Sequence, residues 1–217
     1  IAKVASSKIV PNKLYGVDVM CKVITEMGGK NAVIVTANAE LDETVAGILS
    51  SAFGHAGQKC SALSRVIAHR SVVDKLAQRL AAACADLKVG PAHDFGTAMN
   101  PVIALEDRDR LRKQVQEAVR EAQEKGGKVI VDRSQEELPG YCVGPCVLEL
   151  PMKAARDPSS FAQRELFGPV VHLVGHDSIE EALALFNSSE YALTGGVFAQ
   201  SQDDIDHCLK HMQCGNI

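Results

Sequence analysis

The length, composition and charge of this chain exclude several classes of protein. Of its 217 residues, 46% are hydrophobic and 23% are charged, which is typical of a folded globular protein and not of a disordered, collagen-like or low-complexity chain. The 23 basic and 27 acidic residues give a net charge of −4 without a basic cluster, so nucleic acid is not an expected partner. The sequence has no uninterrupted run of about 18 apolar residues, so no transmembrane helix is expected.

The first part of the chain alternates apolar runs with amphipathic stretches. Strands are expected at residues 22–26 and 32–36, the second as a continuous buried run. Apolar side chains at steps of three and four then predict a helix from Leu41, with Asn38 as its cap and Gly57 as its end.

The rest of the chain continues this alternation. Further strands are expected at residues 64–68, 128–131, 146–150, 169–174 and 195–199, and further helices at 106–125 and after the capping residues Ser71, Ser178 and Ser201. Short connections between strands and helices predict an α/β fold, with a mostly parallel sheet that carries helices on both faces.

A short turn between a helix and a strand carries Cys60, in the sequence G-Q-K-C-S-A at residues 57–62. Lysine and free backbone amides beside a cysteine stabilise its thiolate, and a turn exposes it, which suits a nucleophile. The alternative interpretation is a small buried hydrophobic residue, as most free cysteines are.

A carboxylate followed by two glycines forms a second candidate site, in the sequence E-M-G-G-K-N at residues 26–31. Two glycines after a strand allow a sharp turn and the close approach of a ligand to the main chain. Strand ends of a parallel sheet are where active sites of this architecture form. Taken alone, the signal of Glu26 is weak, because a glutamate before a Gly-Gly turn is usually a solvated residue at the rim.

The two segments, together with Q-R-E-L-F-G-P-V at residues 163–170, resemble the aldehyde dehydrogenase superfamily. That family has a glutamate opening E-x-G-G-K, a cysteine in G-Q-x-C after 34 residues, the spacing of Glu26 and Cys60, and an E-x-F-G-P-V motif. Within that superfamily, the sequences of these motifs are similar to those of the glutamate-semialdehyde (1-pyrroline-5-carboxylate) dehydrogenase branch. The resemblance implies the catalytic-domain fold of the family.

The resemblance implies roles for named residues. Cys60 is expected to be the nucleophile that forms a thiohemiacetal and then a thioester, and Glu26 the general base that hydrolyses it. NAD is the expected cofactor, with NADP as an alternative. Its contacts are expected at Glu165, Phe167, Met27 and Gly28.

The same resemblance implies an aldehyde substrate that carries a carboxylate, namely L-glutamate 5-semialdehyde, which is oxidised to glutamate in proline catabolism. Ser61 and Lys59 beside the nucleophile suit an anionic substrate. Phe53 reads either as an apolar wall for the substrate or as a core residue at helical spacing.

The resemblance also implies a domain division. Residues 1–26 are expected to end a preceding dinucleotide-binding domain or to form a linker strand, and residues 27–217 to form a truncated catalytic domain that is inactive by itself. The parent enzyme is expected to be a homo-oligomer, and to hold FAD only if it also carries a proline dehydrogenase domain. Seven cysteines without a disulfide framework favour a reducing, cytoplasmic location.

Two alternatives stay open. The chain could belong to another aldehyde dehydrogenase, including a CoA-acylating one, although Glu26 argues against that branch. It could also be a non-catalytic binding or structural module, for example one that holds zinc through His207, Cys208, His211 and Cys214. The i, i+4 histidines lack a further run of ligands, so no metal is expected and a solvated helix face is favoured.

Overall fold

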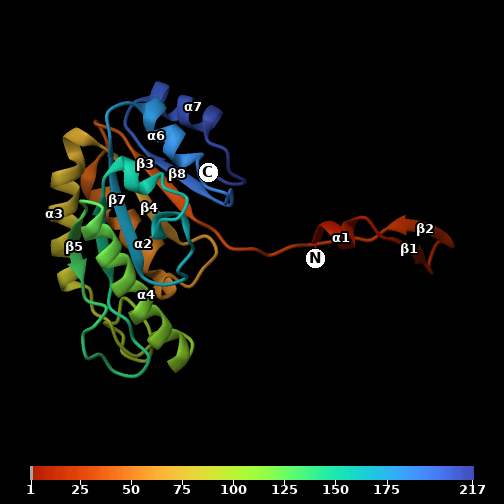
Figure 1. Cartoon of the computed structure of the whole chain (residues 1–217), viewed down its shortest axis with the longest axis horizontal. Coiled ribbons are helices and arrows are strands. Elements are labelled where there is room, and N and C mark those ends of the chain that lie inside the picture. Colours follow the sequence, from red (N-terminus) through yellow and green to blue (C-terminus); the bar gives the residue numbers. More distant parts are fainter. Residues whose placement is uncertain (1) are drawn as a thin grey trace.

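Six strands form one sheet in the order β5-β6-β7-β4-β3-β8 in the computed structural model, which describes residues 2–217 (Figure 1). All neighbouring pairs are parallel except β5 and β6, which are antiparallel. The strands are β3 (Asn31–Val35), β4 (Leu63–His69), β5 (Lys128–Asp132), β6 (Cys146–Leu150), β7 (Val170–His176) and β8 (Gly195–Phe198). The predicted mostly parallel sheet is therefore confirmed.

Helices cover both faces of this sheet, as predicted (Figure 1). Successive residues of a strand point to opposite faces, so Val35 joins one hydrophobic core with α2 and α3, while Ile34 joins a second core with α4 and α6. Two buried faces explain why the central strands read as continuous apolar runs. The helices are α2 (Leu41–Phe53), α3 (Arg70–Asp86), α4 (Leu105–Glu124), α5 (Met152–Ala155), α6 (Ile179–Phe186) and α7 (Gln202–His211).

Two of the predicted helix caps are confirmed and two are wrong. Ser178 and Ser201 cap α6 and α7 by accepting a backbone N–H three residues later. Glu40, not Asn38, caps α2, because the Asn38 side-chain oxygen already receives the Thr36 hydroxyl and the Gln200 N–H. At α3 the cap is the His69 ring, which accepts the Ser71 N–H, and α2 ends at Phe53 before Gly57.

The strand expected at residues 22–26 is absent from the described structure. A small helix α1 (Ala2–Ser6) and an antiparallel pair, β1 (Ile9–Asn12) with β2 (Val17–Met20), lie away from the main sheet (Figure 1). Residues 21–30 connect them to β3 in an extended form without strand pairing, because no neighbouring strand of the described chain lies beside them. Among residues 2–217, no helix is long and apolar enough to cross a bilayer.

Candidate active site

The Cys60 turn, residues 57–62, begins with an unusual backbone. After α2, a 3-10 segment η1 (Gly54–Gly57) holds His55, Ala56 and Gly57 at φ values of 57°, 53° and 70°. Left-handed conformation is costly for residues with a Cβ, so surrounding contacts must hold it. A Cβ at Gly57 would lie 2.3 Å from the Gly168 carbonyl oxygen, so only glycine allows this turn to touch the loop after Phe167.

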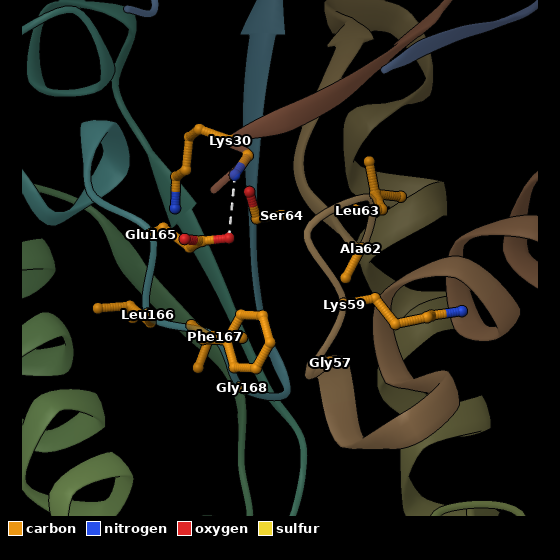
Figure 2. Close-up of a pocket in the computed structure, with 12 residues that line it drawn as sticks. Lys30, Gly57, Lys59, Ala62, Leu63, Ser64, Glu165, Leu166, Phe167 and Gly168 are labelled. Carbon is orange, nitrogen blue, oxygen red and sulfur yellow. Dashed lines mark hydrogen bonds between the residues drawn. The ribbon is translucent and has the colours of Figure 1, made fainter. Parts of the chain in front are cut away.

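Glu165 joins the second and third sequence motifs. Its Oε1 accepts the Gly29 N–H over 3.0 Å, shown as the dashed line in Figure 2. A Cβ at Gly28 would lie 2.1 Å from the other carboxylate oxygen, and one at Gly29 would lie 2.0 Å from the Cys60 carbonyl oxygen. Gly29 is therefore needed for the backbone to pass the Cys60 turn, whereas a side chain at Gly28 would displace only the flexible Glu165 carboxylate.

A pocket lies where these loops meet. Figure 2 shows Glu165 and Phe167 on one side and the chain from Gly57 to Leu63 on the other. Phe167 has φ 55° and is 42% exposed, so a strained backbone holds an aromatic ring in the open. A carboxylate acceptor beside an exposed ring can bind a ligand that combines hydroxyl groups with a planar ring. Glu165 and Phe167, both predicted to contact a dinucleotide, line the same pocket.

The other predicted site residues have different surroundings. Cys60 is half-buried, and Glu26 is exposed in the extended segment before β3. Met27 is exposed beside Gly28. Ser61 and Lys59 are both exposed on the Cys60 turn, where the Lys59 side chain points away from Glu165 (Figure 2). No hydrogen bond or ion pair between side chains joins these residues in the described chain.

Phe53 is a core residue, which was one of the two roles that the sequence predicted for it. It is 1% exposed and packs with Ile48 and Leu76 between α2 and α3. It does not face the pocket.

Sequence reasoning missed a buried cluster of basic residues, formed by Lys30, which lines the pocket, together with Arg65 and His172. Burial, reinforced by Arg65, lowers the pKa of Lys30 to about 7, while Glu165 opposes the shift. Burial lowers the pKa of Arg65 to about 10, and burial beside Lys30 and Arg65 keeps the pKa of His172 well below its usual range. The available signal was a basic residue directly before β3, at Lys30, and one inside each of two largely apolar strands, Arg65 in β4 and His172 in β7.

The histidines and cysteines of α7 do not converge. The His207 and His211 rings lie 4.6 Å apart, Cys208 is buried, and Cys214 follows the helix. Within residues 2–217, no group of three or more His, Cys, Asp or Glu side chains could hold a metal ion.

Known proteins resemble this chain over most of its length. The model of the aldehyde dehydrogenase family matches residues 7–217. A 1-pyrroline-5-carboxylate dehydrogenase of Staphylococcus haemolyticus is 34% identical over 196 residues, which are 90% of this chain and 36% of that protein. The chain thus spans little more than a third of that relative.

Solved structures share the fold. Proline utilization A from Bdellovibrio bacteriovorus superposes with a TM-score of 0.78 and 38% identity, over 88% of this chain and 19% of that one. The Thermus 1-pyrroline-5-carboxylate dehydrogenase with bound NAD gives a TM-score of 0.78 and 31% identity, over 88% and 35% of the two chains.

Proposed function

The chain belongs to the aldehyde dehydrogenase family, and on that premise we propose that it is the catalytic part of an NAD-dependent glutamate-semialdehyde dehydrogenase. In this proposal the parent protein oxidises L-glutamate 5-semialdehyde, formed from 1-pyrroline-5-carboxylate, to glutamate in proline catabolism. The observation that carries the proposal is the contact of three motif loops: Gly29 binds Glu165 and lies against the Cys60 carbonyl. The substrate choice draws on the names of the relatives.

Cys60 and Glu26 divide the chemistry between them. The Cys60 thiolate attacks the aldehyde carbon and forms a thiohemiacetal, which becomes a thioester on losing a hydride. NAD, when bound, supplies the hydride acceptor. Glu26 takes a proton from water, the resulting hydroxide attacks the thioester carbon, and the carbon–sulfur bond breaks to release glutamate and restore the thiolate.

Four residues are proposed to hold the cofactor. Glu165 would accept a hydrogen bond from a ribose hydroxyl, and Phe167 would lie against the nicotinamide. Met27 and Gly28 would contact the cofactor from the segment that lies against the Glu165 carboxylate. NADP is the alternative cofactor, and FAD enters only if the parent also carries a proline dehydrogenase domain.

Substrate binding is proposed to depend on groups beside the nucleophile. The Ser61 hydroxyl and the Lys59 ammonium are the exposed polar groups of the Cys60 turn and suit a carboxylate. Phe53 could act only through the packing of α2, because it is buried. The proposed arrangement assigns residues 1–26 to the end of a dinucleotide-binding domain or a linker, and residues 27–217 to the catalytic domain.

Steady-state kinetics of the full-length protein test this function. We expect reduction of NAD with glutamate semialdehyde, loss of turnover in Cys60→Ser, and little change in Cys214→Ser, a second half-buried cysteine. If an uncharged aldehyde of similar length were turned over as fast as glutamate semialdehyde, the proposed substrate preference would be wrong. Turnover that requires CoA would establish the acylating alternative, and no turnover with any aldehyde would favour a binding module.

Light scattering of the full-length protein tests the proposed homo-oligomer, and cell fractionation tests the proposed cytoplasmic location.

A further inference from the structure

Two carbonyl groups of the Cys60 turn are bound by one buried side chain. Asn31 is 4% exposed, and its Nδ2 donates to the Cys60 and Ala62 carbonyl oxygens, both over 2.8 Å. Because the peptide bond is planar, fixing the Cys60 carbonyl fixes the peptide plane that follows the thiol-bearing residue. A bond from the Ala62 N–H to the Lys59 carbonyl closes the turn from within, over 3.0 Å.

The local backbone explains why Asn31 reaches this turn. Asn31 pairs with Leu63 in the sheet, but Ala32 pairs with Arg65, so Ser64 is an extra residue of β4 at this point. Such a bulge redirects neighbouring side chains. Gly29 removes the Cβ that would meet the Cys60 carbonyl oxygen, and so leaves that oxygen free for the Asn31 amide.

The other end of the same side chain holds a distant segment. Asn31 Oδ1 accepts the Thr194 N–H over 3.0 Å, directly before β8. Thr194 forms a parallel bridge with Asn216, and the Gly195 N–H donates to the Asn216 carbonyl over 2.8 Å. One buried amide therefore links the Cys60 turn to β8 and to the segment around Asn216.

We propose that Asn31 is a positioning residue for Cys60. Its side-chain hydrogen bonds fix the turn that carries the thiol relative to the start of β3 and to β8. The inference rests on the proposed function only for the role of Cys60 as nucleophile. Asn31 touches no reacting atom in this proposal and acts through the Cys60 backbone.

Asn31→Ala in the full chain tests the proposal through two measurements on Cys60. Loss of the two hydrogen bonds to the turn, at about fivefold each, should raise the equilibrium constant for opening of the turn by about twenty-five-fold. We expect amide hydrogen exchange of residues 59–63 to accelerate accordingly. We also expect the pH profile of Cys60 alkylation by iodoacetamide to change, relative to Cys21 in the same sample.

Two further variants separate positioning from general stability. Asn31→Asp keeps the acceptor for the Thr194 N–H but loses both donors, so it should loosen the turn even if alanine prevents folding. Asn187→Ala is the matched control, because Asn187 also donates to a backbone carbonyl, of His211, and accepts a backbone N–H, of Gln213, but lies between α6 and α7.

The proposal is overturned if exchange at residues 59–63 and Cys60 alkylation in Asn31→Ala and Asn31→Asp match those of Asn187→Ala. Neither measurement requires turnover. If the Asn31 variants loosen the turn but the unmodified protein shows no dehydrogenase activity, the proposed function is contradicted and the positioning role of Asn31 still holds.

Discussion

The Arg65 guanidinium donates from Nε to the Lys30 carbonyl oxygen over 2.8 Å, and both basic side chains are buried, with Lys30 lining the pocket. The other guanidinium nitrogens bind the carbonyls of Leu185 and Phe186, so Arg65 is well satisfied. The Lys30 ammonium lies in a buried region with a neighbouring positive charge, and Glu165 is the anion that favours it. Burial beside the Arg65 charge therefore makes the Lys30 amine and the His172 ring resist protonation, because it lowers the pKa of both groups.

The burial of Lys30 predicts a pH-dependent stability. Its pKa is about 7 in the folded chain against 10.5 for a solvated lysine, so between these values the unfolded chain binds more protons and stability rises with pH. Lys30→Met removes this contribution. We expect the variant to be more stable than the parent near neutral pH, by roughly 1 kcal/mol or more, and this advantage to shrink toward alkaline pH. Urea unfolding of both proteins across that range measures it, and a constant difference would contradict it.

Gly28 and Gly29 should respond differently to alanine. Gly29→Ala sets a Cβ against the Cys60 backbone carbonyl, which cannot move alone, and should lower the free energy of unfolding by about 2 to 4 kcal/mol. Gly28→Ala meets only the flexible Glu165 carboxylate, and should cost about 1 kcal/mol or less while raising the KM for NAD. Gly90→Ala, whose nearest atom lies 3.4 Å away, is the control. Equal losses in the two variants would contradict this distinction.

Glu26 is predicted to act after hydride loss. In Glu26→Gln of the full-length protein, the thioester should form while water is not activated, giving a burst of reduced cofactor followed by slow turnover. Stopped-flow absorbance measures the burst. Its disappearance would assign Glu26 to an earlier step.

Cys60 should be the thiol whose alkylation inactivates the enzyme. Burial raises the pKa of Cys208 to about 11 and that of Cys146 well above its usual range, so these thiols react slowly in the folded chain. Limited alkylation followed by peptide mapping should place the adduct on Cys60 in proportion to lost activity. Loss of activity with Cys60 unmodified, and label on Cys142 or Cys208, would exclude it as nucleophile.

The 217-residue chain by itself should fold without dehydrogenase activity. Its two cores bury both sheet faces. In the proposed function, however, Glu165 and Phe167 supply only part of the dinucleotide site. The N-terminal segment exposes Ile9, Leu14, Tyr15 and Met20, so self-association through this apolar surface is expected. Circular dichroism, an NAD-reduction assay and size-exclusion chromatography with and without residues 2–20 check these points. Turnover within about tenfold of an intact relative would contradict the first.

Local patterns in the sequence were enough to predict the sheet and most of its helices. Short apolar runs that alternate with amphipathic stretches predicted β3, β4, β6 and β7, and the continuous run at residues 32–36 reflects a strand, β3, that is buried on both faces. Ser178 and Ser201 marked two helix starts, since capping depends on residues within one turn. Residues 22–26 misled the same reasoning, because an apolar segment becomes a strand only where a partner strand exists.

The sequence by itself determined which loops carry chemical groups, and the tertiary structure decided how those groups are held. The three motifs around Glu26, Cys60 and Glu165 are visible as residue types at set spacings. The sequence does not show that Lys30 and Arg65 are buried, nor that both ends of the Asn31 amide form hydrogen bonds with distant segments. A buried polar group must find its partners wherever the fold places them, and the Asn31 amide finds them 29 to 163 residues away.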